Sequence, residues 1–220
     1  MTRPRRAALA ALLASATLAA GCQALGSLAY YFRPRQIQKP EFEFPAGSRV
    51  AFVIEAADPR YESPVFNEAL YERTVQTLRD GGSKAEFLPL RAAADLRRDH
   101  PDFDQWSLQR IGRELNASHV LYVRIDRLTI RQSPDYPVLT PAVELHMKVI
   151  GCGKDPEQAR LWPAAREGYA VSRTRPAAEA ADSEPDAADI QARKLGIETA
   201  YWVALPFIAV DREVKPPVEP

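Results

Sequence analysis

One short stretch of the chain combines residue types that could bind a metal ion. His100, Asp102 and Asp104 alternate in the sequence His-Pro-Asp-Phe-Asp, and imidazole and carboxylate groups at alternate positions of a loop are possible metal ligands. A metal site must supply a full set of ligands, and this stretch has one histidine and no second cluster nearby in sequence. Turn formation and helix capping around Pro101 explain the same residues. We therefore expect no metal site here.

Cys152 is a second candidate, within the turn-like sequence Gly151-Cys152-Gly153. A nucleophilic cysteine needs a neighbouring base and a lowered pKa. His119 and His146 lie on or next to expected strands, and nothing in the sequence places either beside Cys152. We expect a buried or unreactive thiol, with pairing between chains as the alternative outside the cytoplasm. A glycine-rich phosphate loop, a nucleophile elbow and paired metal motifs are also missing from the sequence. We predict no catalytic residue, no cofactor and a protein that is not an enzyme.

The amino terminus divides into a basic start, an apolar core and a run of small residues. Arg3, Arg5 and Arg6 come first, and an apolar run over 7–20 follows, interrupted only by Ser15 and Thr17. This arrangement is typical of a secretory signal. The run is shorter than the ~20 apolar residues that a bilayer crossing needs. Residues 1–21 are therefore predicted to be a signal peptide.

The end of that segment, Leu18-Ala19-Ala20-Gly21-Cys22, resembles the lipobox of bacterial lipoproteins. The small residues Ala20 and Gly21 fit a tight protease site, and the Cys22 thiol can accept a diacylglycerol group. The family prefers leucine three residues before the cysteine, where this chain has Ala19, with Leu18 one position earlier. The resemblance implies that signal peptidase recognises residues 18–21 and cuts before Cys22, which then carries lipid such as palmitate. The alternative is an ordinary secretory signal with an incidental cysteine.

The anchor and the charge together bound the location and the partners. Two or more acyl chains hold a protein on a membrane, whereas one chain binds only marginally. Gln23 follows Cys22, and by resemblance to well-studied lipoproteins this favours the outer over the inner membrane, with the domain on the periplasmic side. Cleavage removes three of the 29 basic residues and none of the 29 acidic ones, which leaves a formal charge of −3. We expect no nucleic-acid partner, because phosphate neutralisation supplies most of that affinity.

The remaining chain suits a single globular domain. Hydrophobic residues make up 46% of the sequence, which is enough for a core. We expect a lipid-anchored linker over 22–47 and one domain over 48–212. An insert at 176–189, rich in alanine, acid and proline, is expected to be a loop or disordered. A flexible tail is expected over 213–220.

Hydrophobic periodicity predicts the order of the elements. Ser63 and Pro64 begin a helix that Gly81 ends, and Ser107 caps another. The remaining expected elements are strands over 49–55, 84–88, 120–130, 143–149 and 169–172, helices over 91–98 and 190–205, and a loop over 133–141. The apolar phase flips near Asp126, which indicates a β-bulge. The order is β-α-β-α-α-β, followed by antiparallel strands and a carboxy-terminal helix. It predicts a mixed α/β (α+β) fold, with helices packed on a mixed sheet.

The segment over 102–125 runs from a helix through a tight turn into a strand. Its core over 111–121, with the sequence IGRELNASHVL, resembles a stretch of certain envelope lipoproteins. These are the curli-secretion type, the penicillin-binding-protein activators and the amino-terminal domain of the Tol-system β-propeller protein. Gly112 would let the helix lie close to the sheet, and Ala117 would fit the tight turn. The transmembrane hairpin segments of the pore-forming curli type are missing from the sequence. The resemblance implies an assembly or interaction module whose partner is another envelope protein.

Two other classes of function stay open on the sequence alone. A hydrolase using Cys152 or the His100 region would require a base within hydrogen-bond reach. A carrier of a small ligand would require a sizeable apolar cavity within the fold.

Overall fold

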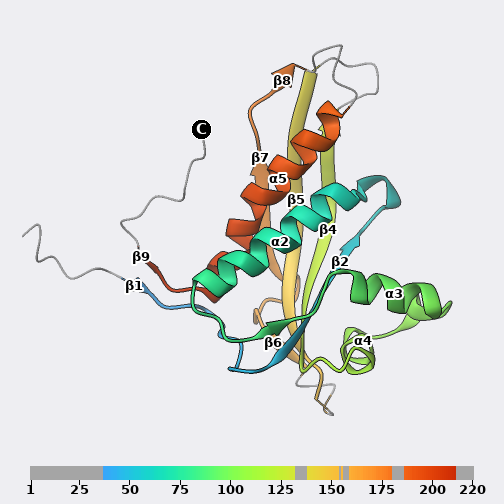
Figure 1. The fold of residues 1–220 in the computed structure, drawn as a ribbon, viewed down its shortest axis with the longest axis vertical. Helices are drawn as coiled ribbons and strands as arrows, with labels where there is room; N and C mark the ends of the chain where they lie inside the picture. Colours follow the sequence, from blue (N-terminus) through green and yellow to red (C-terminus); the bar gives the residue numbers. More distant parts are fainter. Residues whose placement is uncertain (1–36, 132–137, 154, 156–158, 180–185, 212–220) are drawn as a thin grey trace, which may run out of the picture. The chain divides into compact units, whose positions relative to one another are not determined.

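The computed structural model describes residues 37–131, 138–153, 155, 159–179 and 186–211 (Figure 1). The chain divides into two units, one of residues 1–38 with 211–220 and the other of residues 39–210. In the first unit the described parts are β1 (Ile37–Gln38) and Asp211, the second residue of β9 (Val210–Asp211). The predicted signal-peptidase site Leu18–Gly21, the lipidated Cys22 and the tail over 213–220 lie outside the described residues. Among the residues described, no helix is both long and apolar enough to span a membrane.

The second unit is built on a mixed seven-stranded sheet. Its strands are β2 (Arg49–Ala56), β3 (Glu86–Phe87), β4 (His119–Arg131), β5 (Val138–Gly151), β6 (Arg160–Trp162), β7 (Tyr169–Thr174) and β8 (Ala178–Glu179). The order is β3-β2-β4-β5, and β6, β7 and β8 all pair with β5. Strand β2 runs parallel to β3 and β4, whereas the other pairs are antiparallel. The predicted α+β fold and its element order are confirmed.

The helices follow the local signals in the sequence. They are η1 (Pro59–Tyr61), α2 (Pro64–Asp80), α3 (Arg91–Asp99), η2 (Phe103–Gln105), α4 (Leu108–Glu114), α5 (Ala187–Ala204) and η3 (Leu205–Phe207). Ser63 Oγ accepts a hydrogen bond from Phe66 N at 3.3 Å at the start of α2. Ser107 Oγ accepts one from Arg110 N at 3.2 Å at the start of α4. Both predicted caps are therefore present, and each satisfies one otherwise free backbone donor.

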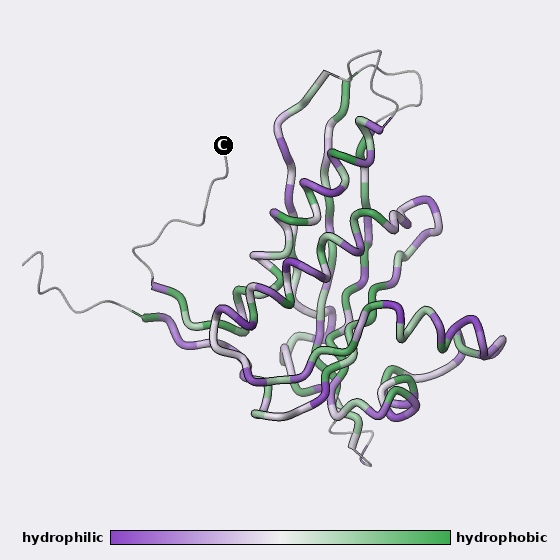
Figure 2. Tube along the Cα trace, in the orientation of Figure 1, coloured by the Kyte–Doolittle hydropathy of each residue, from purple (hydrophilic) through white to green (hydrophobic). Residues whose placement is uncertain are grey.

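Helices α2 and α5 lie side by side over one face of the sheet (Figure 1) and enclose the larger core. The strands supply alternate apolar residues to this face, and Figure 2 shows hydrophilic and hydrophobic residues interleaved along β4 and β5. Gly196 lets the two helices approach closely, because a Cβ built there would lie 2.8 Å from Phe66 O. Close helix contact thus depends on the missing side chain at this position.

The other face of the sheet is covered only in part. A smaller apolar cluster lies at one end, where α4, η2 and α3 pack on β2, β4 and β5. Its fully or nearly buried members are Ala51, Val53, Leu88, Phe103, Trp106, Ile111, Ala117, Val120, Ile150 and Cys152. Beyond this cluster the same face carries polar and charged residues, and several of them are exposed.

The predicted bulge in β4 is confirmed. Ile125 pairs with Leu145 and Arg127 pairs with Glu144, so Asp126 is an extra residue without an opposite residue on β5. The extra residue changes the phase of the alternation, and both Ile125 and Leu128 face the larger core.

Three expectations about connecting segments differ from the structure. The loop expected over 133–141 is wrong in its last part, because β5 begins at Val138, and residues 132–137 lie outside the described residues. Pro141 is accommodated where the β4–β5 register shifts between Thr129 and Arg131. The insert expected over 176–189 contains β8 and the first residues of α5 at its two ends. The packed unit also begins before residue 48, since Phe44 is buried against the larger core.

Candidate functional site

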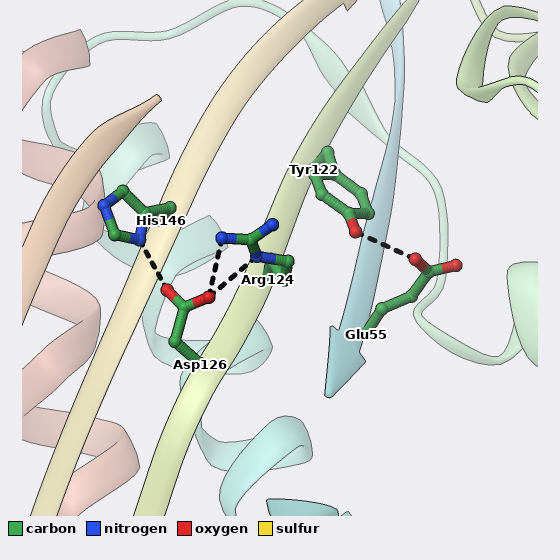
Figure 3. Close-up of polar contacts among 5 residues, drawn as sticks. All are labelled: Glu55, Tyr122, Arg124, Asp126 and His146. Atoms are coloured by element: carbon green, nitrogen blue, oxygen red, sulfur yellow. Dashed lines mark hydrogen bonds and ion pairs between the residues drawn. The ribbon is translucent and has the colours of Figure 1, made fainter. Parts of the chain in front are cut away.

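A group of polar side chains crosses the partly covered face of the sheet, next to the end of the smaller apolar cluster. It consists of Glu55 from β2, Tyr122, Arg124 and Asp126 from β4, and His146 and Lys148 from β5, and we call it the polar row. Strand register places these residues together. Tyr122 pairs with Lys148, Arg124 pairs with His146, and Glu55 pairs with Arg124. Figure 3 shows five of the six side chains on the side of the strands turned away from α2 and α5.

Asp126 is the centre of one half of the polar row (Figure 3). Its Oδ1 accepts a hydrogen bond from Arg124 Nε at 2.7 Å and forms an ion pair with Arg124 Nη2, also at 2.7 Å, while its Oδ2 contacts Nδ1 of His146. The three side chains are between a quarter and a half exposed. Because Asp126 is the bulge residue, it is free of a direct cross-strand neighbour and reaches both groups.

Glu55 is the centre of the other half. Its Oε2 accepts a hydrogen bond from the Tyr122 hydroxyl at 2.9 Å, and its Oε1 accepts one from Arg97 of α3 at 2.9 Å. Arg97 also lies 3.4 Å from Asp104, so α3 and η2 are joined to the sheet through these charges. Burial, and then the negative charge of Glu55, raise the pKa of Tyr122 well above its usual value. The tyrosine therefore stays a neutral donor to the carboxylate.

Lys148 lies above the ring of Tyr122, with Nζ 5.0 Å from the ring centroid. Within the described part of the chain, its ammonium group forms no ion pair with a carboxylate. Burial lowers the pKa of Lys148, and the neighbouring cations Arg160 and Arg124 lower it further, while Glu55 acts in the opposite direction. Lys148 is thus held by its stem and by the ring face rather than by a counter-ion.

A cleft of about 810 Å³ lies between the polar row and the η2–α4 segment. Glu55, Tyr122 and Lys148 line it from the sheet, and Arg97 and Trp106 line it from the opposite wall. A second cleft of about 600 Å³ adjoins it between α2 and α3 and shares the Arg97 lining. Both volumes are in the range of ligand and side-chain binding sites, about 300–1,000 Å³. Neither is an enclosed apolar cavity, since charged groups line both clefts.

The polar row has an acid–histidine pair, and the described residues bring no hydroxyl or thiol of a serine, threonine or cysteine to it. Among the described residues, no serine, threonine or cysteine side chain forms a hydrogen bond with His146. Nucleophilic catalysis requires a nucleophile within hydrogen-bond reach of its base. The arrangement instead fixes charges and donors in defined positions on three rigid strands, which suits recognition of a polar partner group.

The structure places the sequence candidate around His100 in a packed turn. The His100 ring lies against Trp106, with centroids 4.8 Å apart, and Trp106 Nε1 donates to Asp102 Oδ2 at 2.8 Å. Asp104 faces Arg97 instead. Within the described ranges, no three His, Cys, Asp or Glu side chains are grouped in a way that could hold a metal ion. The turn interpretation therefore explains the geometry of this stretch.

Cys152 is buried in the smaller apolar cluster and packs against α4. Burial raises the pKa of its thiol to about 11, and no base among the described residues forms a hydrogen bond with it. His119 lies elsewhere, next to Ser118 Oγ and the rings of Phe42 and Phe44. The expectation of a buried thiol is confirmed, and a hydrolase acting through Cys152 is not supported.

Sequence reasoning did not identify the polar row. The alternation over 143–149 correctly put His146 and Lys148 on the polar face of β5. The available signal was the phase flip at Asp126, since a polar residue at a bulge often has a side chain directed to a particular task.

Comparison with known proteins gives no family assignment. No protein-family model matches the chain, and no curated protein matches it. Among solved structures, a PelC dodecamer from Paraburkholderia phytofirmans is 17% identical, with a TM-score of 0.39, over 78% of this chain and 96% of that chain. Lipoprotein GNA1162 from Neisseria meningitidis is 11% identical, with a TM-score of 0.38, over 65% and 91% of the two chains. Lipoprotein B from Nitrosomonas europaea is 11% identical, with a TM-score of 0.35, over 79% and 87%. Structural neighbours of the chain thus include bacterial lipoproteins, but scores this low identify neither the particular lipoprotein group that residues 111–121 resemble nor a function.

Proposed function

We propose that this protein is a lipoprotein of the bacterial envelope, whose globular unit binds another envelope protein. Lipid on Cys22 would hold it on the periplasmic side of the outer membrane, as the sequence Leu18–Cys22 indicates. The observation that carries the binding role is the polar row, an ion-paired network on a partly covered sheet face that lines a cleft.

The geometry of the polar row favours a role in recognition. Asp126 and Glu55 are each held by two neighbouring groups, so little side-chain entropy is lost when a partner binds. Beyond His146 the same face continues with the exposed residues Glu144 and Ser172, which pair across β5 and β7 and extend the polar surface away from the cleft. Polar surfaces of this kind are compatible with interfaces between proteins that also exist apart.

A position-specific cross-linking experiment tests the binding role. A photoreactive amino acid placed at Glu144 or Ser172 in the full lipidated protein should give an adduct of defined mass in living cells. The matched control is Lys194, which is exposed on α5 at the opposite face of the sheet. An adduct that is absent at Glu144 and Ser172, or equally strong at Lys194, would contradict the proposal.

The anchor is tested by Cys22→Ser. The change removes the thiol and keeps the basic start and apolar core of the signal, so export continues while lipid transfer stops. We expect no incorporation of labelled fatty acid, loss of stable membrane attachment and an unchanged urea unfolding curve. Mass spectrometry of the wild-type amino terminus decides the point, and an unmodified Cys22 or a different first residue would refute it.

A further inference from the structure

Among the described residues, the Lys148 ammonium group forms no ion pair with a carboxylate, although Glu55 of the polar row lies near enough to attract it. Glu55 is occupied by Tyr122 and Arg97, and Asp126 is occupied by Arg124 and His146. Within the described residues, the Lys148 ammonium group lies over the Tyr122 ring and is attracted by Glu55 without forming an ion pair, and the side chain lines the cleft of about 810 Å³. A partly buried cation without a counter-ion favours an anion bound from outside.

The surroundings of Lys148 add further positive charge. Arg160 of β6 lies opposite Ile150 of β5. Ile150 is two residues after Lys148 and on the same face of the sheet, so Arg160 is on that face as well. Its guanidinium donates to the backbone carbonyls of Ala165 at 3.1 Å and Arg166 at 2.8 Å, and it forms no ion pair with a carboxylate of the described residues. Arg160 and Arg124 both repel the Lys148 ammonium group. An anion placed in the cleft would reduce this repulsion.

We infer that Lys148 binds a carboxylate of the partner, namely an acidic side chain or the chain terminus of a peptide segment lying in the cleft. This inference rests on the proposed function, because it assigns the partner's contact at the same face. The remaining lining of the cleft indicates this class of anion. Glu55, Glu62 and Asp104 line the same cleft, so a doubly charged phosphate would meet more repulsion than a singly charged carboxylate. The apolar wall of Trp106, Leu108 and Ile150 can receive the aliphatic part of an acidic side chain.

Calorimetry on the full lipidated protein in neutral detergent tests the inference. The probe is a capped peptide of alternating Glu and Ala, and its matched control has Gln in place of every Glu. Lys148→Met keeps the aliphatic stem over Tyr122 and removes the charge, and Lys194→Met on α5 is the control variant. We expect the wild type to bind the Glu peptide and not the Gln peptide. Lys148→Met should bind the Glu peptide with a roughly tenfold higher Kd, which is the effect of losing one hydrogen bond to a charged group. Lys194→Met should bind like the wild type.

Competition identifies the anion that the cleft prefers. Acetate at high concentration should displace the Glu peptide, and inorganic phosphate at the same ionic strength should not. Equal binding by Lys148→Met and the wild type, binding of the Gln peptide, or displacement by phosphate alone would each overturn the inference. A cooperative urea unfolding curve of Lys148→Met excludes misfolding as the cause of any loss, and Lys148→Gln provides a second variant if Met does not fold.

The two proposals fail in different ways. Cross-links from Glu144 that persist unchanged in Lys148→Met, together with no binding of the Glu peptide, would overturn the carboxylate site and leave the protein-binding role standing. Binding of the Glu peptide at Lys148 without any position-specific cross-link in cells would overturn the protein-binding role and leave the carboxylate site.

Discussion

Substitution of Gly112 by alanine tests how closely α4 packs on the sheet. A Cβ built at Gly112 would lie 2.1 Å from Cys152 Sγ and 2.8 Å from Val120 Cγ2. Ordinary van der Waals contacts are about 3.5–4.0 Å, so the sulfur would have to move by more than about 1 Å within a buried cluster. The helix and the strand cannot both keep their positions in the variant.

The expected loss of stability is the difference between two effects. Overpacking of a core costs about 1–3 kcal/mol, and two contacts below 3 Å place this site at the upper end. Alanine in a helix interior gains about 1 kcal/mol over glycine. Gly112→Ala should therefore lower the free energy of unfolding by about 2 kcal/mol. With a urea dependence of about 2 kcal/mol per molar, the midpoint should fall by about 1 M.

A double-mutant cycle with Cys152→Ala separates the clash from other causes. Cys152→Ala alone should cost about 1 kcal/mol, because it removes one buried sulfur atom. In the double variant the nearest clashing atom is missing, so Gly112→Ala should cost less than in the wild type. The loss of stability in the double variant should therefore be at least about 1 kcal/mol smaller than the sum of the two single losses. An unchanged urea midpoint for Gly112→Ala, or costs that add within about 0.5 kcal/mol, would refute the reasoning.

Three further predictions follow from the packing, the buried thiol and the bulge. Gly196→Ala should lower the urea midpoint, because the new Cβ would lie 2.8 Å from the Phe66 carbonyl oxygen, and a backbone atom cannot rotate away as a side chain can. An unchanged midpoint would show that α2 and α5 separate freely. Stability should fall as pH rises from about 9 towards 11. The Cys152 thiol has a pKa of about 11 in the folded protein and a lower pKa in the unfolded chain, so the unfolded chain loses this proton at lower pH. Urea curves should show a shallower fall for Cys152→Ala, and equal slopes would contradict the assignment. Deletion of Asp126 should leave a regular β4–β5 ladder and a folded protein. Deletion of Arg124 should instead turn Ile125 out of the core, so that this variant unfolds at a much lower urea concentration. Similar urea midpoints for the two variants would count against the observed register.

Local signals in the sequence predicted the elements well because they act within a few residues. Ser63 and Pro64 determine where α2 begins, and the alternation over 143–149 determines which face of β5 is buried. The close approach of α4 to the sheet was also predicted, since Gly112 is the residue without a side chain at the contact. In each case the cause lies in the segment itself or in its immediate packing.

The loop expected over 133–141 shows where local reasoning failed. Three prolines favour a loop when only the segment is considered. In the structure Pro141 lies in β5 at a point where the register with β4 shifts, and its missing N–H is tolerated there. The position of a shift depends on the partner strand, which the sequence of β5 does not contain.

The polar row has a related origin, and the bulge in β4 links the fold to the site. An extra residue at Asp126 lets Leu128 and Ile130 return to the core face after Ile125, so the core alone would favour the irregularity. The residue left without an opposite neighbour is then available to bind Arg124 and to contact His146 of the next strand. A small or apolar residue at the same position would serve the core equally well, yet it would leave a histidine and an arginine paired across the strands without a counter-charge. The phase flip in the sequence therefore shows where the strand bends, whereas the acid at that point is explained by the network it completes.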